Sequence, residues 1–143
     1  MFKTFVLSLL IILGSVAANA KKQEKTNVMF FEIRAMTGFN PEQTKLLEGI
    51  VLSELYKYKK FNVISKGDVE KILSNEEFKQ MVDCNSTSCM LEISGALGAE
   101  ILVSGEVGKL GDMIQLNMQM INNQDGTVYS RVGETVMGIN ELV

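Results

Sequence analysis

A strand–helix–strand succession near the amino terminus most strongly constrains the fold. Residues Val28–Met36 are rich in aromatic and β-branched side chains, which is typical of a strand buried on both faces. Asn40 is a suitable N-cap, and the proline and glutamine that follow it predict a helix from Pro41 to about Lys59. Phe61–Ser65 is a second short strand. This order predicts a parallel βαβ unit with a right-handed crossover.

Three short helices are expected before the next strand. Ser65 opens the first helix, the chain breaks near Leu73, and Ser74 opens the second. Ser88 is the predicted cap of the third helix, Cys89–Leu97, which a glycine ends. The apolar segment Glu100–Val107 is then predicted to be a central third strand.

The carboxyl-terminal third changes to a period of two, which is typical of half-buried antiparallel strands. We expect four even-numbered residues to face the core: Ile114, Leu116, Met118 and Met120. The odd-numbered residues between them should face solvent or a partner: Gln115, Asn117 and Gln119. Turns are expected at Lys109–Asp112 and Asn122–Gly126, with a last strand at Thr127–Val136 and a helix-like tail at Gly138–Val143. The predicted fold is therefore α/β: a mixed sheet whose parallel core has strand order 2-1-3, extended by an antiparallel meander, with helices packed on it.

The first twenty residues have the pattern of a secretory signal peptide. Lys3 precedes an apolar run, Ala18-Asn19-Ala20 fits a cleavage site, and a charged segment begins at Lys21. The apolar run is too short to span a bilayer, which takes about 20 residues. We therefore expect residues 1–20 to be removed after Ala20 and residues 21–143 to form a single soluble α/β domain in the periplasm or outside the cell. The tail leaves open whether the natural chain continues beyond Val143.

Composition excludes several classes of function. The chain has a net charge of −3, and loss of Lys3 with the signal would make it −4. Without a basic stripe, a nucleic-acid partner is not expected, and we assign the cluster of Lys57, Lys59 and Lys60 to the solvated end of a helix. The chain has no histidine, the commonest general base and metal ligand. No catalytic residues, cofactor or metal are therefore predicted.

Cys84 and Cys89 are the only cysteines, and in an exported chain they predict one structural disulfide. The alternative, a redox-active pair, fits less well because four residues separate them instead of two. Asn85-Ser86-Thr87 between them also matches a glycosylation acceptor, although three residues form a weak pattern.

Three other motifs favour ordinary structure over ligand binding. Gly105, Gly108 and Gly111 lead from a strand into another strand, whereas a phosphate loop leads into a helix. The hairpin at Asn123–Gly126 lacks the terminal carboxylates of a calcium loop. Met118 and Met120, with Met113 nearby, could hold Cu(I), but their face also carries aliphatic residues and predicts core packing.

The segment from FNVISKGDVEKIL through CNSTSC to LGAEILVSGEVGKLGD resembles small exported α/β domains of bacterial envelope proteins. These are the domains related to the curli secretion channel protein CsgG, the penicillin-binding-protein activator LpoB and the amino-terminal domain of TolB. The resemblance implies a non-enzymatic binding or assembly module. This chain lacks the lipidated cysteine and the membrane-inserting hairpins of the channel relatives, so a pore is not expected.

We therefore predict an exported module that acts through protein–protein contacts at the bacterial envelope, carried by edge strands and the acidic surface, with oligomerisation left open. The alternative is a small-ligand carrier or enzyme with a pocket at the carboxyl ends of the parallel strands. Three segments would line that pocket: Met36–Asn40, Ser65–Gly67 and Ser104–Glu106.

Overall fold

The computed structural model describes residues 24–138, which form five strands and four helices. In chain order these are β1 (Thr26–Ala35), α2 (Pro41–Lys57), β2 (Phe61–Ser65), α3 (Lys66–Glu70), α4 (Asn75–Val82), α5 (Thr87–Ala96), β3 (Ile101–Leu110), β4 (Met113–Asn122) and β5 (Val128–Val136). The predicted signal peptide and residues 139–143 of the predicted tail lie outside the described residues.

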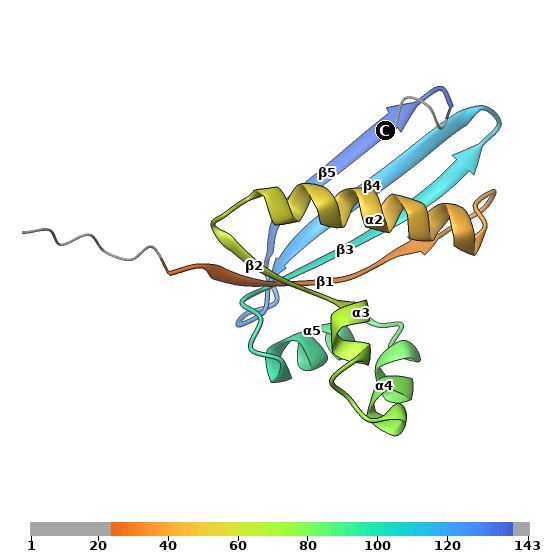
Figure 1. The fold of residues 1–143 in the computed structure, drawn as a ribbon. Helices are drawn as coiled ribbons and strands as arrows, with labels where there is room; N and C mark the ends of the chain where they lie inside the picture. Colours follow the sequence, from red (N-terminus) through yellow and green to blue (C-terminus); the bar gives the residue numbers. More distant parts are fainter. Residues whose placement is uncertain (1–23, 139–143) are drawn as a thin grey trace, which may run out of the picture.

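The strands form one mixed sheet in the order β2-β1-β3-β4-β5. β1 pairs in parallel with both β2 and β3, and β3, β4 and β5 follow as antiparallel neighbours. The predicted fold class, with its parallel 2-1-3 core and antiparallel meander, is confirmed. Helix α2 crosses one face of the sheet, whereas α3, α4 and α5 gather as a lobe at one end (Figure 1).

The helix starts follow local capping signals. The Asn40 side chain accepts a hydrogen bond from the Gln43 amide at 2.9 Å, and the Gln43 side chain accepts one from the Asn40 amide at 3.2 Å. This reciprocal pair is the predicted capping box of α2, which ends at Lys57, two residues earlier than expected. Ser65 and Asp68 form a second capping box at the start of α3.

The predicted cap of α5 was wrong. Ser86, and not Ser88, is the N-cap: its hydroxyl accepts a hydrogen bond from the Cys89 amide at 3.3 Å, and the helix begins at Thr87. The extended backbone of Ser86 aims its hydroxyl at that amide, whereas Ser88 already lies within the first helical turn.

The β3–β4 turn is tighter than expected. β3 continues to Leu110, which pairs with Met113, so that only Gly111 and Asp112 lie between the strands. Gly111 has a φ of 62°, a conformation that favours glycine in a two-residue hairpin. Because β3 continues past the predicted end at Val107, the β3–β4 hairpin extends beyond the helical lobe (Figure 1).

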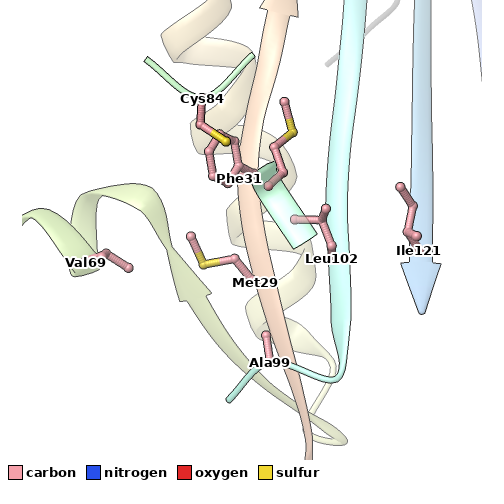
Figure 2. Close-up of a cluster of buried hydrophobic side chains, with 8 residues drawn as sticks. Met29, Phe31, Val69, Cys84, Ala99, Leu102 and Ile121 are labelled. Carbon is pink, nitrogen blue, oxygen red and sulfur yellow. The ribbon is translucent and has the colours of Figure 1, made fainter. Parts of the chain in front are cut away.

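Two buried clusters lie on opposite faces of the sheet. One packs beneath α2 and contains Val28, Phe30, Ile33, Leu47, Val103, Val107 and Ile114. The other joins the sheet to the helical lobe and contains Met29, Phe31, Val69, Cys84, Met90, Ala99, Leu102 and Ile121 (Figure 2). β1 therefore contributes to both clusters, as its predicted burial on both faces requires.

β4 shows the expected alternation. Ile114 is buried, and Leu116, Met118 and Met120 are half-buried against the cluster beneath α2. On the opposite face Gln115 and Asn117 are exposed and Gln119 is half-buried. Within residues 24–138 no helix is long and apolar enough to cross a membrane.

Candidate functional site

The helical lobe covers only part of its face of the sheet, and the rest, which we call the open face, carries mostly polar side chains. One cross-strand row runs through Arg34, Glu106, Asn117 and Gly133. The open face consists of Arg34 on β1, Ser104 and Glu106 on β3, Gln115, Asn117 and Gln119 on β4, and Arg131, Gly133 and Thr135 on β5. Alternation with a period of two sets these side chains opposite those that pack beneath α2.

A groove of about 430 Å³ lies in the middle of the open face. Residues of four strands, β1, β3, β4 and β5, line the groove, and one wall comes from the disulfide loop and α5. Its polar lining includes Arg34, Glu106, Asn117, Gln119, Arg131 and, in the wall, Asn85. The groove presents arginine and carboxylate groups together with side-chain amides, which both donate and accept hydrogen bonds.

Hydrogen bonds and ion pairs hold the β1 side of the groove. Glu32 accepts from Lys66 Nζ at 2.9 Å and lies 3.7 Å from Arg34 Nε. Arg34 Nη2 also donates to the main-chain oxygen of Asn85 at 3.2 Å, which ties the disulfide loop to the sheet. The charged groups on the β1 side of the groove are therefore already engaged in contacts within the chain.

The rest of the groove retains binding capacity. Gln119 Nε2 donates to Ser104 Oγ at 3.2 Å, which fixes one amide on the floor. Glu106 and Arg131 are exposed, and within residues 24–138 neither makes an ion pair. A bound partner would therefore find on this face one carboxylate and one guanidinium that form no ion pair within residues 24–138.

An exposed apolar rim borders the polar groove at the β3–β4 turn. Its members lie at the ends of β1, β3, β4 and β5: Met36, Leu110, Met113 and Met137, which are 53%, 77%, 42% and 65% exposed. Met36 and Met113 line one hollow together with Gln115. Exposed apolar side chains that cluster beside polar groups are typical of contact surfaces, and methionine adapts readily to differently shaped partners.

The cysteine loop forms the groove wall. Cys84 and Cys89 are joined by a disulfide with Cα atoms 5.8 Å apart. Asn85 in this loop is exposed, whereas Cys84 is buried in the cluster beneath the lobe. The disulfide thus links the packing of the lobe to the edge of the groove.

A bulge in β1 sets the position of Arg34. Phe30 pairs with Val103 and Ile33 with Gly105, so two residues of β1 lie opposite one of β3. The Ile33 amide, left without a strand partner, donates to Glu48 Oε1 of α2 at 2.8 Å. Burial raises the pKa of Glu48, and the hydrogen bond from Ile33 opposes that rise.

The predicted pocket at the carboxyl ends of the parallel strands does not form. Ser104–Glu106 line the groove of the open face, and Ser65–Gly67 line a hollow beside α2. Of Met36–Asn40, only Met36 and Thr37 line a third hollow. The ends are not level, because β2 stops at Ser65 opposite Phe30 while β1 and β3 continue. The three segments therefore do not line one common pocket.

The other motifs lie in ordinary structural positions. Gly105 lies opposite Met118, and a Cβ on Gly105 would overlap the methionine sulfur. Met118 and Met120 pack beneath α2, but Met113 lies on the other face, so the three do not form the copper site considered above. In the described part of the chain no three cysteine, aspartate or glutamate side chains gather to hold a metal ion.

Sequence reasoning missed Arg34, Glu106 and Arg131 as neighbours. The sequence does contain a signal for Glu106 and Arg131. Each is a charged residue in a predicted strand, and each lies opposite a residue of the predicted polar face of β4. The bulge shifts Arg34 onto the same face, and nothing local in the sequence marks that bulge.

Comparison with known proteins relates this chain to solved structures only. No family model and no curated protein sequence matches it. The LpoB C-terminal domain from Escherichia coli superposes with a TM-score of 0.62 at 14% identity, over 88% of this chain and 92% of that domain. Lipoprotein GNA1162 from Neisseria meningitidis gives 0.61 at 13% identity, over 80% and 83%. The PelC dodecamer from Paraburkholderia phytofirmans gives 0.53 at 17% identity, over 81% and 73%.

These comparisons bear out the LpoB part of the predicted resemblance at the level of the fold. The TolB match has a TM-score of 0.49 and carries no argument, and the comparisons do not show the CsgG part. The chain thus shares the fold of the LpoB C-terminal domain and of lipoprotein GNA1162.

Proposed function

We propose that this chain is a non-enzymatic protein-binding module of the bacterial envelope and that the open face is its contact surface. The observation that carries the proposal is the combination on one face of an exposed methionine-rich rim with a carboxylate and a guanidinium, those of Glu106 and Arg131, that form no ion pair within residues 24–138. Methionine and arginine are enriched in protein interfaces, and this face carries both. The fold shared with LpoB and GNA1162 supports an envelope location.

The proposal includes export. Residues 1–20 are removed after Ala20, and residues 21–143 act as one domain in the periplasm or outside the cell. Amino-terminal sequencing of the protein from the cell envelope should return Lys21. A sequence that starts at Met1 would contradict export by this signal.

A photo-activated amino acid tests the contact surface. Placed at Asn117, in the middle of the open face, it should crosslink one protein in intact cells; the matched control is Leu46, which is exposed on α2. Glu106→Lys reverses a charge beside Asn117 and should reduce that crosslink at least tenfold without changing the circular dichroism spectrum. Equal crosslinking at Asn117 and Leu46, or no effect of Glu106→Lys, would argue against the open face as the contact surface.

A further inference from the structure

The edge of strand β5 offers a second surface, which adjoins the open face at Arg131, Gly133 and Thr135. Its nine residues form one border of the sheet, and all except Val136 are exposed. Val132 is 54% and Tyr129 62% exposed. Natural edge strands usually carry lysine, proline or a covering segment, which prevent pairing with another chain. β5 has neither lysine nor proline, its two charged residues Arg131 and Glu134 have opposite signs, and no helix or strand among residues 24–138 covers it.

The direction of the backbone groups on β5 follows from its pairing with β4. The Asn122 amide donates to the Thr127 main-chain oxygen at 2.7 Å, so the backbone groups of Asn122 point toward β5. Because this direction alternates along a strand, the backbone groups of Met120, Met118 and Leu116 also point toward β5. Their partners include Ser130, Val132 and Glu134. The intervening residues Arg131, Gly133 and Thr135 therefore direct their amides and carbonyls to the open edge.

We propose that a second copy of this chain pairs with that edge, β5 antiparallel to β5, about a twofold axis at Val132. The axis is perpendicular to the sheet, so the faces of the two copies continue into one ten-stranded sheet. The main contacts of α2 and the helical lobe with the sheet are with β1, β2 and β3, and in Figure 1 no helix lies beyond the outer edge of β5.

The side chains of β5 are self-complementary in this register. Val132 lies opposite Val132 of the second copy in a pair without hydrogen bonds, where cross-strand side chains come closest. Arg131 lies opposite Gly133, which has no side chain to obstruct it, and these two residues exchange both backbone hydrogen bonds. Ser130 lies opposite Glu134, whose carboxylate can accept from the hydroxyl. The pairing thus provides hydrogen-bond partners for backbone groups of β5 that point away from β4, including those of Arg131 and Gly133.

Cysteine crosslinking tests the register directly, because the described chain has no free cysteine. Opposed Cα atoms in such a pair lie about 4.5 Å apart, within the range a disulfide spans. Val132→Cys should therefore form a disulfide-linked dimer under mild oxidation. Ser130→Cys and Glu134→Cys should each remain monomeric on a non-reducing gel, while an oxidised mixture of the two should give a crosslinked dimer.

Sedimentation velocity of residues 21–143 tests the pairing without crosslinks. The wild type should shift from monomer to dimer as concentration rises, and Arg131→Pro should weaken the association at least tenfold because it removes an outward amide. Arg131→Gln keeps that amide and is the matched control. A wild type that stays monomeric together with uncrosslinked Val132→Cys, or efficient crosslinking of Ser130→Cys alone, would overturn the inference. The cysteine crosslinks use Ser130, Val132 and Glu134, which are not members of the open face, so either proposal can fail without the other.

Discussion

A substitution of Glu48 tests whether its side chain stabilises the β1 bulge. Its carboxylate accepts the 2.8 Å hydrogen bond from the Ile33 amide, at a place where β2 no longer pairs with β1. Glu48→Ala would leave this part-buried amide without a partner, which costs about 1–3 kcal/mol for a buried donor. Because the site is only partly buried, we expect about 1–2 kcal/mol, measured as a lower midpoint of urea unfolding at pH 7 with an unchanged slope.

Glu48→Gln separates the hydrogen bond from the charge. The glutamine oxygen can still accept from Ile33, while the charge that burial disfavours is gone. We therefore expect Glu48→Gln to unfold within about 0.5 kcal/mol of the wild type at pH 7, or to be slightly more stable.

The pH dependence has a defined sign. Burial raises the pKa of Glu48 in the folded protein above its ordinary value of 4.5. As the pH falls from 7 through this raised pKa, the folded state takes up the proton before the unfolded state does, and stability increases. Other carboxyls such as Asp68 have lowered pKa values and act in the opposite direction, so the comparison must be made against Glu48→Gln.

We define the difference as the unfolding free energy of the wild type minus that of Glu48→Gln. This difference should increase as the pH is lowered from 7 to 5. A difference that stayed flat or fell would refute the assigned effect of burial. Equal stability of the Ala and Gln variants at pH 7 would refute the role of Glu48 as the partner of the bulge.

Three further predictions concern the sheet and the lobe. Gly105→Ala should destabilise the protein by about 1–3 kcal/mol in urea unfolding, because its Cβ would lie 2.9 Å from the Asn117 main-chain oxygen and overlap a methionine of β4; stability within 0.5 kcal/mol of the wild type would contradict that packing. Leu116→Ala should cost about 2 kcal/mol, at the low end for core truncation because the side chain is half-buried, whereas Asn117→Ala should cost under about 0.5 kcal/mol; similar losses would refute the assigned faces of β4. Thiol titration of the unreduced, denatured protein should find Cys84 and Cys89 bonded, and two free thiols would disprove the disulfide.

Local patterns in the sequence were enough to predict the sheet. The βαβ order requires a parallel pair with a right-handed crossover, and the period of two in β4 requires a polar and an apolar face. The capping boxes at Asn40 and Ser65 likewise depend on residues three apart in the chain. In each case the interacting groups are sequence neighbours or repeat at a fixed spacing, so a linear sequence contains the information.

The candidate site depended on the tertiary structure. Where β2 stops relative to β1, how the bulge turns Arg34 toward Glu106, and which parts of the sheet the lobe covers are all set by contacts between residues far apart in sequence. The predicted pocket failed for this reason, since strands that end at different heights cannot bring their carboxyl ends together. The sequence by itself determined which side chains alternate along each strand; only packing between elements decided which of those faces stayed open.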